Sequence, residues 1–255
     1  MTMSERRLKI MDVLEKRNVI TTRELEKLLY SSTSTIRRDL LELEKQGRII
    51  REHGEVKLVQ SKNIDYSYES RLDEQVKSKE LIAEVASVFI GPNQAIFLDS
   101  SSTTSFLLPY LRKISNLQII TNAVDLAPKL NKMSNVSLFM TGGEVGYGTN
   151  SILGNFAVDF LEKFYTDIAI FSCRGIDESG SYEADYNQAL IKQKMIKNTK
   201  KTLLLVDSTK FNSPHFFKLA YFDQIDYIIT DKKPNAAFLE KVSETCEVVW
   251  PDEQI

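Results

Sequence analysis

The chain has 255 residues, of which 42% are hydrophobic, and a formal net charge of −2. This length and apolar content allow one small and one larger domain, each with its own core. No apolar run approaches the roughly 18 residues of a membrane span, and Met1 to Lys9 is polar and charged rather than signal-like, so we expect a cytoplasmic protein with no membrane contact. Two widely spaced cysteines and two scattered histidines argue against a disulfide framework, a metal site or another cofactor.

The charge is distributed unevenly along the chain. Residues 1–60 contain 13 Lys and Arg against 10 Asp and Glu, a net charge of +3, which leaves −5 for the remainder. Such a small excess suits a DNA-binding module but also falls within the variation of ordinary protein surfaces. We expect a small domain over 1–60, a linker and the start of a connecting helix over 61–72, and a larger α/β domain over 73–255.

Three helices are predicted in the first sixty residues, with a tight turn between the second and the third. The first covers 4–17, with Ser4 as candidate N-cap. The second begins at Thr21, which has capping-box spacing to Glu24, and the third begins at the N-cap Ser32 and ends at Gly47. The residues expected to face inward are Ile10, Met11 and Leu14 in the first helix, Leu25, Leu28 and Leu29 in the second, and Ile36, Leu40 and Leu43 in the third.

The outward face of the third helix is polar and cationic at its N-terminal turn. Ser34 and Arg38 lie opposite the inward stripe on a helical wheel, and a recognition helix inserts this end into the major groove of DNA. There, Arg can bond guanine edges in bidentate fashion, and Ser or Thr can reach bases or phosphates. The residues expected at the DNA interface are Ser32, Thr33, Ser34, Thr35, Arg37, Arg38, Lys45, Arg48, Arg51 and His53.

A wing is predicted directly after the third helix, because strands at 48–51 and 56–58 are joined around His53 and Gly54. His53 is expected to be a residue of the turn rather than a titrating switch. Leu41 also falls on the outward side of the third helix, where packing under the wing is the one structural explanation. The alternative for the arginines at 37 and 38 is a solvated helix face, with Asp39 and Glu42 as local partners. The neighbouring helices and the wing favour DNA contact.

Strands and helices alternate after a polar stretch at 61–63, which implies a mainly parallel sheet covered by helices. A long helix is expected at 69–90, ended by Gly91 and Pro92. Strands are expected at 95–99, 118–121, 136–140, 167–172, 202–206 and 227–230, and further helices at 104–111, 126–131, 156–164 and 188–198.

The loops after these strands are unusually polar, and open α/β sheets bind ligands at the carboxyl ends of their strands. A Ser/Thr-rich turn that leads into a helix offers hydroxyls and backbone N–H groups suited to a phosphate, and a lysine adds a positive charge. Each feature also has an ordinary structural explanation as a cap, a turn or a solvated side chain. The residues expected to bind an effector are Asp99, Ser100, Ser101, Ser102, Thr103, Thr104, Thr121, Asn122, Gly142, Gly143, Arg174, Gly175, Asp177 and Lys210.

The run Thr-Ile-Arg-Arg-Asp-Leu at 35–40, with Gly47 and Arg-Glu-His-Gly at 51–54, resembles the deoxyribose-operon-repressor (DeoR) family. The resemblance continues through the motifs at 98–104, 142–143, 175–177 and 207–211, and so covers nearly the whole chain. It departs from the usual pattern at Ser31, at Glu55, and at Ser101-Ser102, where a Gly-Thr step is usual. The resemblance implies a sensor related to the ribose-phosphate isomerase and CoA-transferase folds.

The resemblance also implies a phosphorylated sugar or sugar derivative as effector and a homodimer or homotetramer that represses a carbohydrate operon from a double-stranded DNA operator. Effector binding would release the protein from DNA through a population shift. The first alternative is a sugar-phosphate isomerase with an attached DNA-binding module, whose general base would come from Asp177, Glu183, Asp185 or Asp207. The second, a constitutive DNA-binding protein, leaves the polar loops unexplained.

Overall fold

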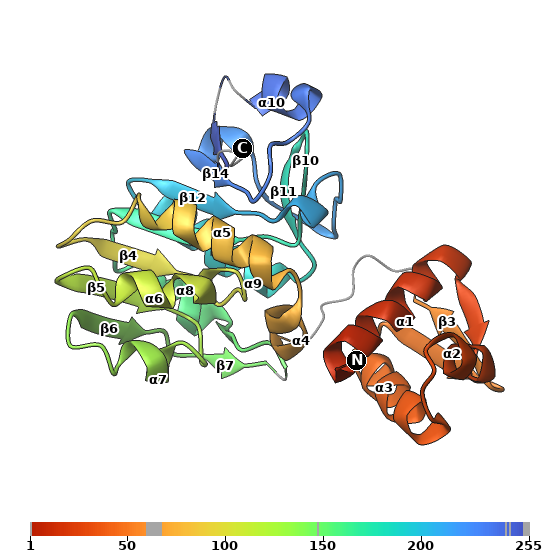
Figure 1. The fold of residues 1–255 in the computed structure, drawn as a ribbon. Helices are drawn as coiled ribbons and strands as arrows, with labels where there is room; N and C mark the ends of the chain where they lie inside the picture. Colours follow the sequence, from red (N-terminus) through yellow and green to blue (C-terminus); the bar gives the residue numbers. More distant parts are fainter. Residues whose placement is uncertain (1, 60–67, 147, 243, 245, 252–255) are drawn as a thin grey trace. The chain divides into compact units, whose positions relative to one another are not determined.

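The computed structural model describes residues 2–59, 68–146, 148–242, 244 and 246–251 (Figure 1). The chain divides into two compact units, an N-terminal unit of Met1–Ser67 and a C-terminal unit of Tyr68–Ile255. Most of the expected linker, 61–67, lies outside the described residues. No helix in the described ranges has both the length and the apolar composition that crossing a membrane requires.

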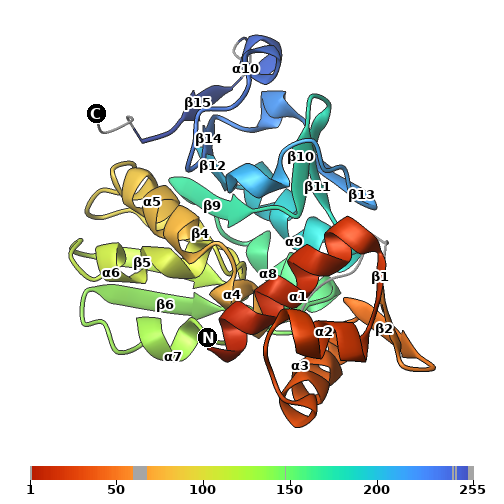
Figure 2. The same cartoon turned by 45° about the vertical axis from the view of Figure 1, so that its right-hand side comes forward.

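The N-terminal unit contains three helices and a three-stranded antiparallel sheet in the order β1-β3-β2 (Figure 2). The three helices and the wing predicted from the sequence are confirmed. Strand β1 was not predicted, because its three residues show no strand pattern of their own and pair with β3 from a distant part of the chain. The elements are α1 (Met3–Arg17), β1 (Val19–Thr21), α2 (Thr22–Leu28), α3 (Thr33–Lys45), β2 (Ile49–Glu52) and β3 (Glu55–Leu58).

Two of the three predicted helix caps are confirmed. The hydroxyls of Thr21 and Ser32 accept backbone N–H groups at the starts of α2 and α3. The prediction of Ser4 as the cap of α1 is wrong, because Thr2 caps this helix and forms a reciprocal capping box with Glu5. Each cap satisfies backbone donors that a helix start leaves without an intrahelical partner.

A Schellman motif ends α3 and directs the chain into the wing. The N–H of Gly47 donates to the carbonyl of Glu44, and the N–H of the next residue donates to that of Leu43, both at 2.9 Å. Gly47 has a φ of 70°, which favours glycine. The wing turn has positive φ at both central residues, 50° at His53 and 84° at Gly54. This is the two-residue hairpin turn that matches the twist of the paired strands.

The core of the N-terminal unit is formed by one face of each helix and the inner face of the sheet. The predicted inward residues of α1 and α3 are all buried. The prediction for Leu28 is wrong, because its side chain is 45% exposed, one turn after the buried Leu25. Helix α2 has only seven residues, and Leu29, at its C-cap, completes its apolar side.

A seven-stranded sheet, parallel throughout, forms the centre of the C-terminal unit, in the order β15-β14-β12-β9-β4-β5-β6. The predicted mainly parallel sheet is therefore confirmed, and the carboxyl ends of its strands share one edge. The strands are β4 (Ala95–Leu98), β5 (Leu117–Thr121), β6 (Val136–Met140), β9 (Ile168–Ser172), β12 (Thr202–Leu205), β14 (Tyr227–Ile229) and β15 (Glu247–Val249).

Helices cover both faces of this sheet, so its central strands are apolar at consecutive positions. In β4, Ile96 and Leu98 belong to one hydrophobic core and Phe97 to the other. The first core is covered by α5 (Val76–Ser87), the 3-10 helix η1 (Thr104–Leu107), α6 (Leu108–Leu111) and α7 (Ala127–Leu130). The second is covered by α8 (Asn155–Leu161), α9 (Tyr186–Lys197) and α10 (Ala236–Val242).

The long helix predicted at 69–90 is instead two helices, α4 (Tyr68–Asp73) and α5, separated at Gln75, which has a φ of 50°. The ammonium of Lys79, in α5, donates to the backbone carbonyls of Arg71 and Glu74 and so links the end of α4 to α5. Several short elements were also not predicted. They are the hairpin β7 (Glu144–Val145) and β8 (Ile152–Leu153), the sheet of β10 (Gly175–Asp177), β11 (Gly180–Glu183) and β13 (Phe217–Ala220), β15, α10, and the 3-10 helices η2 (Ser208–Lys210) and η3 (Phe222–Gln224).

Candidate functional site

Helix α3 is fastened to α1 by a buried charge. The fully buried carboxylate of Asp39 bonds Nε of Arg6 and lies 3.5 Å from Nε of Arg7. The interpretation of Asp39 as a local partner of the arginine pair on α3 is therefore wrong. Arg37 and Arg38 are exposed, and no carboxylate in the described part of the chain is within ion-pair distance of either. Both guanidinium groups can therefore meet an external anion or base.

The hydroxyls at the start of α3 form a small exposed cluster. Oγ of Ser32 lies 3.1 Å from Oγ of Ser34 and 2.9 Å from Oγ1 of Thr35, and it accepts the backbone N–H of Thr35 at 3.4 Å. Ser32 thus works as the cap, whereas Thr33 and Ser34 present their side chains to solvent. The predicted polar N-terminal turn is present.

A groove of about 750 Å³ lies between the start of α2, helix α3 and the wing. It brings together four of the predicted DNA-binding residues, namely Thr33, Arg37, Arg51 and His53, and its remaining lining includes Thr21, Thr22, Arg23, Glu26, Leu40, Glu52, Gly54 and Glu55. Thr22 joins α2 to the wing, since its N–H and hydroxyl donate to the carbonyl of Gly54 at 3.0 and 3.3 Å. Sequence reasoning missed Thr22 and Arg23, because only the pairing of β1 with β3 places them beside the wing.

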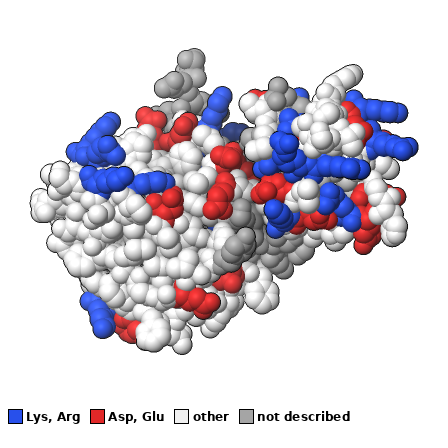
Figure 3. All heavy atoms as spheres, turned by 90° about the horizontal axis from the view of Figure 1, so that it is seen from below, with Lys and Arg blue, Asp and Glu red and all other residues white. Residues whose placement is uncertain are grey.

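The structure does not place the other predicted DNA-binding residues in the lining of this groove; they are Ser32, Ser34, Thr35, Arg38, Lys45 and Arg48. Arg51 is tied to Glu44 of α3 by two guanidinium nitrogens, at 2.6 and 2.9 Å from one carboxylate oxygen, so its position is set by the wing and the helix together. Lys45 is exposed at the end of α3, and Arg48 is half-buried just before β2. Figure 3 shows Lys and Arg side chains over much of the N-terminal unit, at the right of the view, interspersed with acidic ones.

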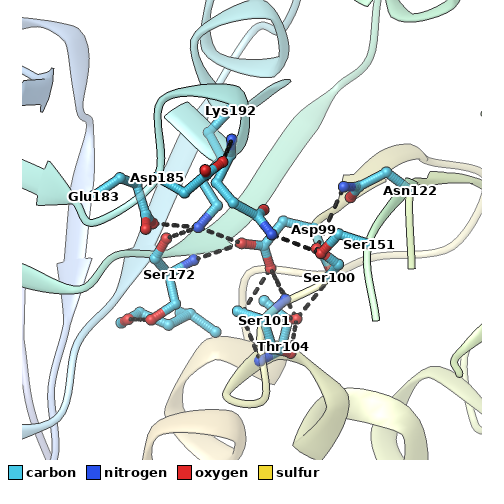
Figure 4. Close-up of polar contacts among 12 residues, drawn as sticks. Asp99, Ser100, Ser101, Thr104, Asn122, Ser151, Ser172, Glu183, Asp185 and Lys192 are labelled. Atoms are coloured by element: carbon cyan, nitrogen blue, oxygen red, sulfur yellow. Dashed lines mark hydrogen bonds and ion pairs between the residues drawn. The ribbon is translucent and has the colours of Figure 1, made fainter. Parts of the chain in front are cut away.

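In the C-terminal unit, Asp99 organises the polar loop that follows β4 (Figure 4). Its fully buried carboxylate accepts the N–H of Ser101 at 3.0 Å, the hydroxyl of Thr104 at 2.9 Å and the N–H of Ser172 at 3.2 Å. The hydroxyl of Ser101 also donates to this carboxylate, at 2.7 Å, so both of its oxygens are occupied and Asp99 fixes the conformation of the loop. The contact with Ser172 also joins the ends of β4 and β9.

Lys192 of α9 completes this network and was not predicted from the sequence. Its ammonium lies 3.3 Å from Asp99, pairs with Glu183 of β11, and donates to the carbonyl of Ser172 at 2.8 Å (Figure 4). Burial alone would lower the pKa of Lys192, but the two carboxylates outweigh burial and raise it above its usual value. A lysine inside a helix has no sequence signal of this role, because its partners come from three other segments.

A second network joins the ends of β4 and β5. The hydroxyls of Ser100 and Ser151 lie 2.6 Å apart, the side-chain amide of Asn122 donates to Ser100 at 3.3 Å, and that of Gln188 donates to Ser151 at 2.8 Å. The predicted residues at 100 and 122 are therefore brought together, whereas Ser151 and Gln188 were missed. The hydroxyl of Thr121 accepts the N–H of the residue at 123 and serves the turn.

Lys210 approaches the same edge from the loop after β12. Its ammonium donates to the hydroxyl of Ser172 at 3.1 Å and lies 3.6 Å from the carboxylate of Asp207. Burial would raise the pKa of Asp207, but Lys210 and the donors of Thr209 hold it below its usual value. Lys79 is the second cation here, and burial, together with the charge of Lys210, lowers its pKa to about 8. The positive charges of Lys210 and Lys79 both help to lower the pKa of Asp207, and only Lys210 lies within ion-pair distance of it.

Several buried polar atoms at this edge lack a hydrogen-bond partner among the described residues. They are Oγ1 of Thr103, Oδ1 of Asn122 and Oγ1 of Thr141, in side chains that are at most 3% exposed. The backbone N–H groups of Ser102 and Thr103 also have no protein acceptor within the described ranges. Buried groups of this kind are almost always paired, so they indicate a place for a bound polar molecule.

The predicted glycines divide into two kinds. A Cβ at Gly175 would lie 1.7 Å from the carbonyl oxygen of Ser213, and one at Gly143, which has a φ of 142°, would lie 2.5 Å from that of Leu153. Both positions therefore need glycine for the packing of the chain itself. Gly142 is exposed, and no atom would lie within 4 Å of its Cβ.

Asp177 belongs to the small antiparallel sheet and Arg174 lies just before it, whereas the loop at 99–104 follows β4 of the seven-stranded sheet. The carboxylate of Asp177 accepts the hydroxyl of Tyr182 at 3.0 Å, within the sheet of β10, β11 and β13. Arg174, between β9 and β10, donates its backbone N–H to the carbonyl of Tyr182 at 2.9 Å. In the described part of the chain, no three His, Cys, Asp or Glu side chains lie close enough to hold a metal ion.

A winged helix-turn-helix unit followed by an α/β unit with a polar strand-end site defines the class of ligand-responsive transcription regulators. Two family models match the chain: the DeoR-like helix-turn-helix domain over residues 6–62 and the DeoR C terminal sensor domain over residues 74–232. The chain belongs to the DeoR family and is a DNA-binding transcriptional regulator. The family predicted from the sequence motifs is thereby confirmed.

Three relatives named as transcriptional regulators share about 30% of their residues with this chain. The HTH-type transcriptional repressor GlcR of Bacillus subtilis is 32% identical over 94% of this chain and 93% of its own length. The L-fucose operon activator of Escherichia coli is 33% identical over 90% and 96%. The glycerol-3-phosphate regulon repressor of Escherichia coli is 29% identical over 96% and 97%.

Solved structures show more distant likeness. Ribose 5-phosphate isomerase from Plasmodium falciparum has a TM-score of 0.39 and 15% identity, covering 53% of this chain and 52% of that one. The translation initiation factor eIF-2B of Pyrococcus horikoshii has a TM-score of 0.47 and 10% identity, covering 89% and 87%. Likeness at this level says nothing of activity.

Proposed function

We propose that this regulator binds a double-stranded operator through α3 and the wing, and that a phosphorylated sugar or sugar derivative bound to the C-terminal unit releases it. The target would be a carbohydrate-use operon, which the protein represses as a homodimer or homotetramer in the cytoplasm. Binding of the effector would favour a state of the protein in which the recognition helices no longer match the operator half-sites.

The observation that carries this proposal is the set of unpaired polar groups at the carboxyl ends of β4, β5 and β6. The N–H groups of Ser102 and Thr103 and the buried hydroxyl of Thr103 lie in the loop that Asp99 holds in place. Lys210 adds a positive charge near this loop. Its ammonium donates to the hydroxyl of Ser172, and the N–H of Ser172 donates to the carboxylate of Asp99. Backbone donors, hydroxyls and an ammonium favour a phosphate dianion far more than a neutral hydroxyl.

The sugar part of the effector would be bound by groups farther along the same edge. Asn122 keeps its side-chain oxygen unpaired, and Thr141 keeps its hydroxyl unpaired. Gly142 leaves its backbone open to close approach. Arg174 and Asp177 would lie at the rim of this site, since both make contacts to Tyr182 of the small antiparallel sheet.

The names of the relatives support a carbohydrate-linked role. They include a repressor, an L-fucose operon activator and a glycerol-3-phosphate regulon repressor. The last of these names refers to glycerol 3-phosphate, a phosphorylated three-carbon compound, which agrees with a phosphate-binding loop at 99–104. Both repression and activation occur among the relatives, and we propose repression because two of these three are named repressors.

The DNA half of the proposal is tested by salt-titrated binding to an operator selected from random duplexes. Arg38→Ala should weaken specific binding by about 1 to 3 kcal/mol and relax sequence preference, because a bidentate contact to a base would be lost. Lys45→Ala should mainly reduce the salt dependence. Both side chains are exposed, so folding should be unchanged. Unaltered affinity and specificity of Arg38→Ala would contradict the assignment.

The effector half is tested by operator binding in the presence of a panel of sugar phosphates and of their unphosphorylated parents. Only phosphorylated compounds should release the DNA, and Lys210→Ala and Ser102→Ala should need more compound while binding DNA normally. Lys201→Ala is a matched control, because this exposed lysine precedes β12, at the opposite end of the strand from Lys210. A panel without any active phosphate, or variants that respond like the parent, would refute the site.

We also propose that the protein does not catalyse sugar-phosphate isomerisation. The four carboxylates considered as a general base are all engaged. Asp177 accepts the hydroxyl of Tyr182, and Asp185 is the N-cap of α9. Glu183 pairs with Lys192, and Asp207 pairs with Lys210. Purified protein should show no turnover of ribose or hexose phosphates. Sustained turnover that copurifies with the protein and disappears in Asp177→Asn would instead establish the enzyme.

A further inference from the structure

Helix α3 carries one large apolar side chain on its outward face. Leu41 is 47% exposed, although Leu40 beside it is fully buried. The partly buried apolar residues that pack against the core of this unit are Val13, Leu29 and Leu58, so Leu41 does not pack under the wing as the sequence interpretation suggested. The fold of the unit therefore makes no use of its side chain.

Leu41 completes an exposed row along the helix. Ser34, Arg37, Arg38 and Leu41 follow one another at i, i+3, i+4 and i+7, which places them on one face. The base-contacting residues of the third helix of homeodomains have the same spacing. The first three members of the row can hydrogen-bond to base edges, whereas leucine offers only methyl groups.

The surroundings of Leu41 favour DNA over a protein as the surface that covers it. Arg37, Arg38 and Lys45, at i−4, i−3 and i+4, are all exposed. An apolar protein surface laid over Leu41 would desolvate these cations without compensation, whereas DNA phosphates would neutralise them. The apolar group that base pairs present in the major groove is the C5-methyl of thymine.

We propose that Leu41 is a specificity-determining residue that contacts the C5-methyl of one thymine in each operator half-site, beside the bases contacted by Arg37 and Arg38. This inference rests on the proposed role of α3 as the recognition helix. It assigns an apolar contact to a helix whose other exposed residues in the row are polar, and it makes the recognised sequence depend on a single methyl group.

The experiment is a double-mutant cycle between protein and DNA. Each thymine of the selected operator is replaced in turn by deoxyuridine, which lacks only the methyl group. One replacement per half-site should weaken binding of the parent protein roughly threefold to tenfold, the range expected for one or two buried carbon groups. Leu41→Ala should weaken binding to the parent operator by a similar factor and should be insensitive to that replacement.

The controls separate this inference from the proposed function. Leu28→Ala removes an equally exposed leucine, 45% exposed on α2, and should bind like the parent. Leu41→Met should retain most of the methyl dependence. If Arg38→Ala weakens binding but no deoxyuridine position couples to Leu41, the thymine contact is wrong and the recognition helix stands. If neither Arg38→Ala nor Leu41→Ala alters binding, the proposed role of α3 fails.

Discussion

Lys192 is a buried cation that lies within ion-pair distance of two buried carboxylates, and its removal should destabilise the C-terminal unit. Its side chain and those of Asp99 and Glu183 are each at most 6% exposed. We predict that Lys192→Met lowers the free energy of unfolding of the C-terminal unit by about 3 to 5 kcal/mol, because it leaves uncompensated charge in the interior. Urea unfolding measures the change.

The matched control for Lys192 is an exposed ion pair in the same unit. Lys129 and Asp125 lie 2.5 Å apart at i, i+4 spacing, with side chains 50% and 41% exposed. Lys129→Met should cost no more than about 0.5 kcal/mol, since solvent screens such pairs. A loss below about 1 kcal/mol in Lys192→Met would mean that the buried charges are compensated in another way.

Lys79 should make stability depend on pH in a definite direction. Its pKa is lowered to about 8 by burial and by the charge of Lys210, whereas an unfolded lysine has a pKa of about 10.4. Between these values the unfolded chain binds a proton that the folded chain does not, so this group raises the free energy of unfolding as pH increases. Below about pH 8 both states are protonated, and its contribution is constant.

Comparison with Lys79→Met isolates the contribution of this group from other groups that titrate in the same range. The parent protein should gain stability relative to the variant between about pH 8 and pH 10.4, and the difference should be flat from pH 6 to pH 7.5. Chemical unfolding at several pH values measures it. A difference that stays constant over the whole range would show that Lys79 titrates normally.

At the scale of elements, β10 begins with a glycine, Gly175, that is needed for packing rather than for ligand approach. A Cβ at Gly175 would collide with backbone at Ser213, whereas Gly142 has open space around it. We predict that Gly175→Ala destabilises the C-terminal unit by several kcal/mol or prevents its folding, and that Gly142→Ala changes its stability by no more than about 0.5 kcal/mol. Thermal unfolding of the two variants compares them directly.

The variants Gly142→Ala and Gly175→Ala also test the effector site. Because Gly142→Ala should fold normally, any loss of effector affinity in it would indicate close approach of the ligand to this backbone. If Gly142→Ala unfolds as readily as Gly175→Ala, the packing argument for these two positions is wrong.

Locally encoded features of the fold were predictable from the sequence. The caps at Thr21 and Ser32, the end of α3 at Gly47 and the wing turn follow from residues a few positions apart, and each is present. The alternation of strands and helices likewise predicted the parallel sheet. The break at Gln75 was missed, because a helical pattern continues across it and the ammonium that closes it comes from the next helix.

The features that were missed depend on pairing between distant segments. Strand β11 pairs with β13 across almost forty residues, and neither has an apolar run like those of β4 and β12, which are equally long. The same holds in the candidate site. The loop residues at 99–104 were predicted from their composition, whereas Lys192 and Ser151 enter the network only through the packing of α9 and of the β8 hairpin. Asp39 was assigned to the wrong arginines because its partners are in α1.

At the scale of the whole molecule, each unit has its own core, so the units can bind their ligands as separate bodies. A regulator nevertheless needs a coupling free energy between its two sites, and thermodynamics requires that coupling to be reciprocal. If the effector weakens operator binding by a given factor, the operator must weaken effector binding by the same factor. A constitutive DNA-binding protein would show a factor of one in both directions.

We predict a coupling factor of about 5 to 150, which corresponds to 1 to 3 kcal/mol. Fluorescence anisotropy gives the Kd of the operator with and without a saturating amount of the active sugar phosphate, and calorimetry gives the Kd of that compound with and without saturating operator duplex. The two ratios should agree. Arg38→Ala should retain the parent affinity for the sugar phosphate, because its change lies in the N-terminal unit, and it should need more operator than the parent before its effector affinity falls. Equal effector affinity in the presence and absence of operator for the parent protein would show that the two units are uncoupled, and the proposed mechanism of release would then be wrong.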